Sequence, residues 1–375
     1  MRIRAAVLHQ MGAPTPYAGS KPLKIETLEL DPPGEGEVLI KIKAAGLCHS
    51  DLSVIEGTRP RPTPMALGHE AAGVVAGIGP GVKSLAVGDH VVLVFVPSCG
   101  HCVPCAEGRP ALCEPAASAN TAGTLLSGAR RLHGAGKDIN HHLGVSGFAD
   151  HAVVSEYSCV KVDKALPFDE AALFGCAVIT GVGAVLNTSR VKAGARVAVI
   201  GLGGVGLNSL LGAQVAGARE IVAIDLRDDK LKLAKQLGAT HTFNASDPDV
   251  VNHVKAATNG GVDYAFEMAG SVPALELAWK ITRRGGETVT AGLPHPQKML
   301  SIAPVQMVGE ERTLKGSYLG SCVPVRDIPA YIALYRAGKL PVDRLMSDRI
   351  KLEQINEAFD KLASGATVRQ VVMFD

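Results

Sequence analysis

The sequence predicts an α/β protein in which a helix-covered parallel sheet is combined with an irregular, strand-rich domain. Three observations carry this prediction. The chain has 375 residues, beyond the size at which a single hydrophobic core stops growing, which favours two domains. Its middle part alternates apolar strands with helices, the order typical of a parallel sheet. That alternation opens on a glycine-rich turn between a strand and a helix, as in doubly wound sheets.

Residues 1–177 form the strand-rich region. Five short runs, separated by Gly, Pro and Asp, have the composition of strands: AAVL, EVLIKIKAAG, EAAGVVAGIG, DHVVLVFV and HAVVSEY. Residues 114–147 are polar, rich in Gly and without a clear period. We expect a long surface excursion there, and long loops of this kind are often functional.

Residues 178–320 carry the alternation of strands and helices, and residues 321–375 return to mixed structure. The last part contains two amphipathic helices, DIPAYIALYRAG and LEQINEAFDKLASG, and a closing strand, QVVMFD. Ile355, Phe359 and Leu362 recur on one face of the second helix. The order predicts a sheet domain inserted between two parts of the other domain.

Composition and charge limit the partners of the chain. It is 47% hydrophobic and 20% charged, and its net charge of +2 gives no reason to expect nucleic acid or an anionic membrane as a partner. The start, MRIRAAVLHQMG, has no apolar stretch long enough for a secretion signal. Residues 197–218 are the longest apolar region, but their patterned glycines argue against a membrane span. We expect a cytoplasmic protein.

The glycine-rich turn has the pattern of a dinucleotide site. Gly201-x-Gly203-x-x-Gly206 follows the strand RVAVI and opens a helix, with Gly204 and Val205 inside the turn. The first glycine permits a tight turn, the second lets a pyrophosphate approach the backbone, and the third allows close helix–strand packing. Asp225 ends the next strand, nineteen residues after Gly206. Its carboxylate should bind the ribose hydroxyls and repel a 2′-phosphate, which favours NAD over NADP.

Four of the eight cysteines lie in CGHCVPCAEGRPALC, namely Cys99, Cys102, Cys105 and Cys113. A reducing compartment favours metal over disulfides. Four thiolates form a closed tetrahedral zinc site, which leaves no room for substrate and is therefore structural. An iron–sulfur cluster is the competing interpretation, but the last gap is seven residues and no Pro follows the fourth Cys directly. Cys159 and Cys322 are expected to be buried thiols.

The whole chain resembles the zinc-dependent medium-chain alcohol dehydrogenases. The resemblance is carried by GHEAAGVV, the four-cysteine loop, HHLGVSGF, GLGGVGL and INEAFDKLASG, which occur in the family's order and spacing. The chain is most similar to the type with a long zinc loop, which includes the liver and formaldehyde-linked enzymes. The resemblance implies a GroES-like catalytic domain over residues 1–177 and 321–375, a Rossmann NAD-binding domain over residues 178–320, and two zinc ions per chain.

The resemblance also implies the ligands of a catalytic zinc, which spacing alone could not select. They are Cys48 in GLCHSD, His69 in LGHEAAG and Cys176 in FGCAVITG, and two Cys with one His leave the fourth position open. Glu70 matches a residue close to the metal that can ligate it transiently. Asp51 matches a carboxylate that orients the zinc histidine.

Further roles follow from the same resemblance. Ser50 matches the hydroxyl of a proton relay, but Ser53 stands where well-known members carry the histidine that ends the relay. We therefore expect the proton to leave through water or another group. Coenzyme contacts are implied for five residues: His49 and Arg369 at the pyrophosphate, Lys230 at a ribose, and Thr180 and Val205 at the nicotinamide.

The substrate pocket is implied only in outline. Phe95 and Phe148 match apolar wall positions. Arg59 stands where members often carry an apolar or acidic residue, so it is either a solvated loop cation or a group that attracts an anionic or polar substrate. It argues against a simple copy of the branch that oxidises glutathione adducts. His141 and His142 are interpreted as loop packing, because the zinc ligands are already accounted for.

These observations predict an NAD-dependent zinc alcohol dehydrogenase. It would transfer hydride reversibly between a primary or secondary alcohol and NAD, giving an aldehyde or ketone. Two alternatives stay open: an S-hydroxymethyl-thiol adduct (formaldehyde-linked) dehydrogenase, and a non-catalytic NAD-binding redox sensor. We expect a homodimer or homotetramer, with SIAPVQM at 301–307 as an edge-strand contact.

Overall fold

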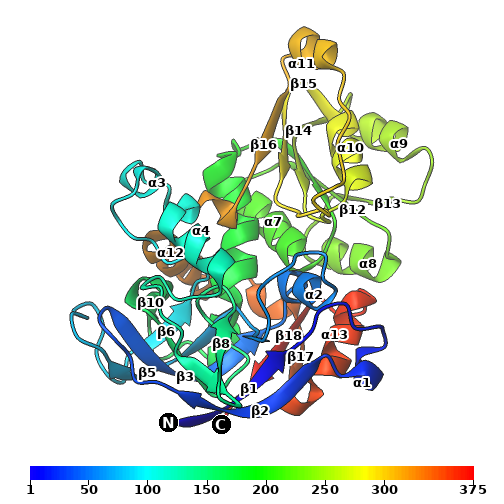
Figure 1. The fold of residues 1–375 in the computed structure, drawn as a ribbon. Helices are drawn as coiled ribbons and strands as arrows, with labels where there is room; N and C mark the ends of the chain where they lie inside the picture. The colour runs from blue at the N-terminus through cyan, green and yellow to red at the C-terminus, as the bar shows by residue number, and fades with distance from the viewer. The chain divides into compact units, whose positions relative to one another are not determined.

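The computed structural model describes residues 1–375, which divide into two compact units. The first unit comprises Met1–Cys176, Val323–Ile332 and Val342–Asp375. The second comprises Ala177–Cys322 and Ala333–Pro341. Both ends of the chain therefore belong to the first unit, and the labels in Figure 1 follow the elements of each unit along the chain.

A small closed barrel forms one part of the first unit. Its strands, in barrel order, are β1 (Arg2–Leu8), β2 (Leu23–Leu30), β7 (Leu132–Gly134), β8 (Lys137–His141) and β4 (Met65–Ala66). Their inward side chains form one buried cluster, which includes Ile3, Val7 and Leu28. The barrel matters for function because β4 and β8 run parallel, so the segments that follow these two strands leave the barrel at the same end.

A seven-stranded sheet forms the rest of the first unit. Its strands are β10 (Cys159–Val162), β6 (His90–Leu93), β5 (Ala71–Ile78), β3 (Glu37–Gly46), β18 (Arg369–Met373), β17 (Met346–Ile350) and, paired with β3, β9 (His151–Ser155). The β3 run alternates buried and half-buried positions, as a strand with one covered face should. The predicted closing strand QVVMFD becomes β18, which pairs antiparallel with β3.

Seven helices lie wholly or mainly in the first unit: α1 (Tyr17–Ser20), α2 (His49–Ile55), α3 (Val103–Ala106), α4 (Glu114–Ala122), α5 (Phe168–Leu173), α12 (Pro324–Arg336) and α13 (Ile355–Ala363). The predicted apolar face of α13 is confirmed, because Ile355, Phe359 and Leu362 are all buried. The two amphipathic helices predicted near the C-terminus are therefore present.

The second unit is a six-stranded parallel sheet with helices alongside. Its order is β13 (His241–Asn244), β12 (Glu220–Asp225), β11 (Arg196–Ile200), β14 (Val262–Glu267), β15 (Thr282–Thr290) and β16 (Thr313–Gly316). Its helices are α6 (Ile179–Gly183), α7 (Gly204–Val215), α8 (Asp228–Gln236), α9 (Val250–Ala257), α10 (Val272–Ile281) and α11 (Pro304–Glu310). The strand order reverses at β11, the first strand of the unit, so the predicted doubly wound Rossmann sheet is confirmed.

One helical run is long and apolar enough to cross a membrane. It covers Phe168–Thr188, and 78% of its most apolar stretch is buried within the fold. It consists of α5, a wide π-helical turn at Phe174–Val178, α6 and a second such turn at Ala184–Thr188. Such burial is that of a core helix. Residues 197–218, whose patterned glycines argue against a membrane span, form most of β11, the glycine-rich turn and α7.

Two expectations about loops are wrong. Residues 114–147 are not a surface excursion, because they supply α4, β7 and β8, and the two strands complete the barrel. The 301–307 segment is not an edge strand, because residues from Pro304 onward form the exposed helix α11. Val305 and Val308 on this helix are 75% and 81% exposed.

Candidate functional site

The side chains of Cys48, His69 and Cys176 converge in the first unit. Their sulfur and ring nitrogen atoms all lie within 4.8 Å of one another, and the three residues are buried. Sheet register explains part of this convergence, because Ala45 on β3 pairs with Ala71 on β5. Cys48 and His69 therefore lie just beyond the same end of this strand pair. Cys176 comes from the π-helical turn, a feature that is frequent at functional sites.

Asp51 fixes the orientation of His69. The Nδ1 atom of His69 lies 3.0 Å from Asp51 Oδ1, in a hydrogen bond to a carboxylate that is fully buried. The carboxylate also accepts hydrogen bonds from the backbone N–H groups of Cys48 and Gly68, both at 3.2 Å. A histidine that donates from Nδ1 to a carboxylate can bind a metal through Nε2, and the buried Nε2 of His69 has no hydrogen-bond partner. Two thiols beside an unpartnered imidazole nitrogen are a donor set that fits zinc.

Glu70 and Arg369 form a buried ion pair beside the same three residues. Arg369 on β18 donates from its guanidinium to Glu70 Oε1, while Oε2 of Glu70 has no partner. Burial raises the pKa of Glu70 to about 7, although Arg369 opposes this shift. A side chain at Gly46 would collide with both residues, which explains a glycine there. The predicted contact of Arg369 with the coenzyme stays a prediction.

The two cysteines of the buried set differ in acidity. A hydrogen bond between the two thiols lowers the pKa of Cys48 well below its ordinary value and raises the pKa of Cys176. Burial alone would raise the pKa of Asp51, but His69 and His142 beside it hold this pKa below the usual range. The two thiols of the set therefore differ in pKa, with Cys48 the more acidic.

Helix α2 begins directly after Cys48 and carries the predicted relay residues. His49 is exposed and Ser50 is half-buried in its first turn. The hydroxyl of Ser53 donates to the His49 carbonyl oxygen at 2.8 Å, so Ser53 binds its own helix. Arg59 follows the helix and is half-buried, and its backbone N–H donates to the carbonyl of Ser53. The roles of His49, Ser50 and Arg59 stay predictions.

The two predicted wall residues lie in different surroundings. The ring of Phe95 packs edge-on against His69, with 5.3 Å between the ring centroids. Phe148 has no exposed surface and packs against Phe359 of α13. The wall assignment of Phe148 therefore stays a prediction, and the contact that the structure shows for this ring is with Phe359.

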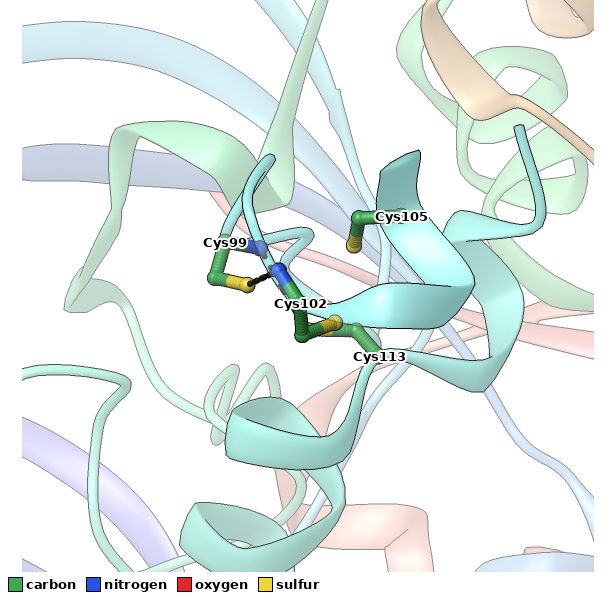
Figure 2. Close-up of side chains that lie close together, drawn as sticks. All are labelled: Cys99, Cys102, Cys105 and Cys113. Carbon is green, nitrogen blue, oxygen red and sulfur yellow. Dashed lines mark hydrogen bonds between the residues drawn. The ribbon is translucent and has the colours of Figure 1, made fainter. Parts of the chain in front are cut away.

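The four-cysteine loop forms a second set in the first unit. The sulfur atoms of its four cysteines all lie within 4.8 Å of one another, although Cys99, Cys102 and Cys105 are partly exposed. Figure 2 shows the four side chains gathered at the loop, with the backbone N–H of Cys102 donating to the Cys99 sulfur at 3.3 Å. A second backbone donor, Cys99 N–H, lies 3.3 Å from the Cys113 sulfur. Such N–H···S contacts favour thiolates, the form that binds zinc.

The glycine turn of the second unit has the geometry of a dinucleotide site. Gly201 has a positive φ of 89°, and a side chain there would lie 2.6 Å from the Ala269 nitrogen. A side chain at Gly206 would collide with the Gly201 carbonyl. By contrast, a side chain at Gly203 would meet nothing within 4 Å. No packing of this chain requires a glycine at 203, so the open space there fits a ligand that approaches the backbone.

Asp225 and the helix after the turn complete this region. Asp225 at the end of β12 accepts hydrogen bonds from Leu202 N–H at 2.6 Å and from Arg227 N–H at 3.0 Å. Gly204 opens α7, whose first turn has no acidic residue and no side-chain cap, so its N–H groups are free to bind an anion. Lys230 on α8 is buried, and burial lowers its pKa.

The remaining predicted coenzyme residues lie where two helices meet. The carbonyl of Val205 on α7 faces Gly181 on α6, where a side chain would collide with it. Thr180, the residue before Gly181, is half-buried. The predicted contacts of Thr180, Val205 and Lys230 with the coenzyme stay predictions.

Sequence reasoning missed two residues beside the buried set. His142 was interpreted as loop packing, but its Nδ1 lies 3.1 Å from Asp51 Oδ1. Asn120 on α4 donates from its side chain to the Phe95 carbonyl at 2.8 Å. Neither residue carries a periodic signal, because each reaches the site through tertiary pairing. For His142, the one available signal was its place in the HHLGVSGF motif.

Comparisons with known proteins cover both units. The alcohol dehydrogenase GroES-like domain matches residues 34–164, and the zinc-binding dehydrogenase domain matches residues 204–337. Over the whole chain, the sequence is 39% identical to the NDMA-dependent alcohol dehydrogenase of Amycolatopsis methanolica, covering 99% of that protein. It is 36% identical to S-(hydroxymethyl)glutathione dehydrogenase of Paracoccus denitrificans, with both chains covered fully. The structure of benzyl alcohol dehydrogenase from Acinetobacter calcoaceticus is similar over both full chains, with 34% identity and a TM-score of 0.93.

Proposed function

The chain belongs to the zinc-dependent alcohol dehydrogenase family, and from that premise we propose which of its residues perform the reaction. The protein is an oxidoreductase whose cofactors are zinc and a nicotinamide dinucleotide. We assign the catalytic zinc to Cys48, His69 and Cys176. The observation that carries this assignment is the buried, unpartnered Nε2 of His69 beside two thiols.

The zinc-binding residues would act as an open site. A bound zinc ion is a Lewis acid that makes an alcohol hydroxyl easier to deprotonate, and NAD accepts the hydride. Asp51 holds the proton on His69 Nδ1 and so keeps Nε2 available to a metal. Glu70, neutralised in part by Arg369, supplies a carboxylate beside the same three residues. These three residues would hold a zinc ion and would leave one of its positions to the substrate oxygen.

We propose that Ser50 takes up the substrate proton and passes it to water. Ser50 is half-buried two residues after Cys48, so its hydroxyl can have partners on both the protein and the solvent side. Ser53 is a poor relay end, because its hydroxyl already donates to the His49 carbonyl. This bond supports the expectation that the proton relay of this protein differs from that of the well-known members, in which a histidine at this position ends the relay.

The coenzyme assigned to the glycine turn is NAD. Support comes from the open space at Gly203, the uncapped start of α7 and the carboxylate of Asp225. We expect Asp225→Asn to reduce the preference for NAD over NADP roughly tenfold, since it removes the charge but keeps a side-chain oxygen for the Leu202 N–H. Steady-state kinetics with both coenzymes measure the change. Equal use of NADP by the parent protein would remove the role given to Asp225.

The proposed substrates are primary or secondary alcohols, with their aldehydes or ketones in the reverse direction. Phe95 supplies an apolar wall beside His69, which favours an apolar substituent on the carbinol carbon. The similar structure named benzyl alcohol dehydrogenase supports an aromatic substituent. The relative named S-(hydroxymethyl)glutathione dehydrogenase supports a thiol adduct as the second candidate.

Initial rates of NADH formation over a panel of alcohols test these substrates. The panel contains short, long, branched and aromatic alcohols, and formaldehyde with and without glutathione. Turnover of aromatic alcohols without thiol supports the leading proposal, whereas turnover that requires the thiol supports the adduct. A parallel series with NDMA as acceptor is included because one relative is NDMA-dependent. If no substrate is turned over in any series although zinc and NAD are bound, the redox-sensor alternative would be supported.

We also propose the organisation of the whole protein. The catalytic domain would comprise residues 1–177 and 321–375, and the NAD-binding domain residues 178–320. We expect a soluble cytoplasmic homodimer or homotetramer, and the exposed Val305 and Val308 of α11 support association of chains. Light scattering of the purified protein measures the number of chains.

A further inference from the structure

The carboxylate of Asp51 serves two histidine rings rather than one. Its Oδ1 atom lies 3.0 Å from His69 Nδ1 and 3.1 Å from His142 Nδ1. All three residues are almost completely buried, with exposed fractions of 0% to 1%. A buried carboxylate is costly unless it is paired, so each ring contributes to holding the charge in place.

The fold delivers His142 to this position through strand pairing. His142 follows β8, whose residue His141 pairs in parallel with Ala66 on β4. His69 follows β4 in the same way, so the two parallel strands carry both histidines to one end of the pair. Two further bonds hold the connection: Gly147 N–H donates to the Gly68 carbonyl, and His142 N–H donates to the Ser146 hydroxyl at 3.1 Å.

The ring of His69 contacts two other rings. His142 and Phe95 both meet it edge-on, with interplanar angles of 90° and 88° and centroid distances of 5.4 and 5.3 Å. Phe95 is fixed in turn by the hydrogen bond from Asn120. Rotation of the His69 ring, which would move Nε2 away from the two thiols, is therefore opposed by both contacts.

The contact of His142 with Asp51 is electrostatic rather than a well-aligned hydrogen bond. Its Nδ1 has no other partner, although it is buried. A ring nitrogen that faces a carboxylate interacts with it favourably when it carries the proton, and this nitrogen has no other group to bind.

We propose that His142 is a positioning residue for the catalytic zinc, acting on the ligand His69 through the shared Asp51 carboxylate and the edge-on ring contact. The proposal rests on the zinc site proposed above at Cys48, His69 and Cys176. It changes the interpretation of His142 from loop packing to part of the outer shell of the metal site. Loss of such partners typically weakens metal binding 10–100-fold.

Matched substitutions of the adjacent histidines test this role. His142→Gln removes the nitrogen at the δ position, whereas His142→Asn places an amide nitrogen there and is the conservative rescue. His141→Gln is the control, because His141 is equally buried but accepts from Arg131 N–H through Nε2, which the glutamine oxygen can replace. Thermal melting and circular dichroism verify that each variant is folded.

The readout is zinc release to a coloured chelator, together with the visible spectrum of the cobalt-substituted buried set. We expect His142→Gln to release the zinc of the buried set roughly tenfold faster and to alter the cobalt bands. His142→Asn should stay within about threefold of the parent, and His141→Gln should match it. The zinc of the four-cysteine loop should leave at the same rate in every variant.

The outcomes separate the two proposals. Parent protein that holds only one zinc, unchanged by Cys48→Ser, would contradict the proposed catalytic site itself. Parent protein with two zinc ions, together with His142→Gln release at the parental rate, would contradict only the role of His142. Equal acceleration in His141→Gln and His142→Gln would reduce both residues to general packing, and would also overturn the proposal.

Discussion

The two cysteine sets of this protein have similar ligand chemistry but are assembled in different ways. The loop set comes from fifteen consecutive residues, and three of its four thiols are partly exposed. The buried set joins residues 48, 69 and 176, none of them more than 8% exposed. Local turns are enough to bring the thiols of the loop set together. The residues of the buried set meet only when two strands, a loop and a helix have packed against one another.

This difference indicates that the two sites have different roles, one structural and one catalytic. Four thiolates complete the coordination of zinc and leave no position for a substrate. Two thiolates and one imidazole leave a position open, and burial excludes competing water. The buried set also has outer partners in Asp51, His142 and Phe95, whereas the loop set is supported by its own backbone N–H groups. The loop set should affect stability, and the buried set should affect catalysis.

Cys48→Ser has the largest expected effect. It removes a ligand of the open site, so zinc should fall from two ions per chain to one and kcat/KM by roughly a thousandfold or more, the equivalent of about 4 kcal/mol. Metal analysis and NADH formation measure both quantities. Cys159→Ser, at a buried thiol outside both sets, is the control and should retain both ions. Near-parental activity of Cys48→Ser would place the reaction elsewhere.

Cys105→Ser should show the opposite pattern. Loss of the loop zinc removes folding free energy, so the melting temperature should fall by roughly 5–10 °C. Activity per folded chain should stay within about threefold of the parent, because the open site keeps its ligands. Calorimetry and rates normalised to the buried zinc test this separation. Abolished activity in chains that remain folded would mean that the loop takes part in the reaction.

The pH dependence of zinc binding should reflect different groups at the two sets. Burial opposes ionisation of Cys99, but backbone N–H groups bring its pKa down to about 7, whereas burial raises the pKa of Cys105 to about 12. Zinc therefore displaces a proton from Cys105 at neutral pH, and one from Cys99 as well once the pH falls below 7. Zinc also displaces protons at the buried set, from Cys176 and His69, whose pKa values are raised, and burial brings the pKa of the neighbouring Glu70 to about 7.

Zinc affinity should consequently fall with falling pH at both sites, and more steeply below pH 7. We expect the slope of the logarithm of affinity against pH to steepen by about one at the loop, through Cys99, and by at most about one at the buried set, through Glu70. Chelator competition on Cys48→Ser reports the loop alone, and on Cys105→Ser the buried set alone. A slope at the loop that stays constant through pH 7 would show that the assigned acidity of Cys99 is wrong.

Asn120→Leu has the smallest expected effect and probes the connection between the sets. Helix α4 follows Cys113, and its Asn120 binds the carbonyl of Phe95, whose ring contacts His69. The unpaired carbonyl should cost about 1–3 kcal/mol of stability, and kcat/KM should fall roughly three- to tenfold as Phe95 loosens. Thr121→Ala, at an exposed residue of the same helix, is the control. An unchanged kcat/KM would show that the two sets act independently.

The sequence predicted most of the fold because most of its signals are local. The EVLIKIKAAG run matches β3 from end to end, and the glycine turn lies between β11 and α7 as expected. The strands β7 and β8 were missed, since three and five residues in a polar, Gly-rich stretch show no clear period. Their pairing with β2 and β4 is set by tertiary contacts.

The two cysteine sets also differ in how far the sequence could predict them. The loop set could be inferred from spacing, but the buried set needed the family resemblance, because residues 48, 69 and 176 share no spacing rule. The role of His142 could not be inferred from either source, since it depends on the register of β8 against β4. The wall assignment of Phe148 stays a prediction, because the resemblance does not show that this ring contacts Phe359.

The most direct test of two zinc sites of different chemistry is zinc X-ray absorption on the parent protein and on the two single-site variants. Four sulfur ligands at about 2.3 Å are predicted for Cys48→Ser, and about two sulfur with about two nitrogen or oxygen ligands for Cys105→Ser. The parent should give the average, about three sulfur ligands per zinc. Four sulfur ligands in Cys105→Ser, or an iron signal in place of zinc at the loop, would contradict the account.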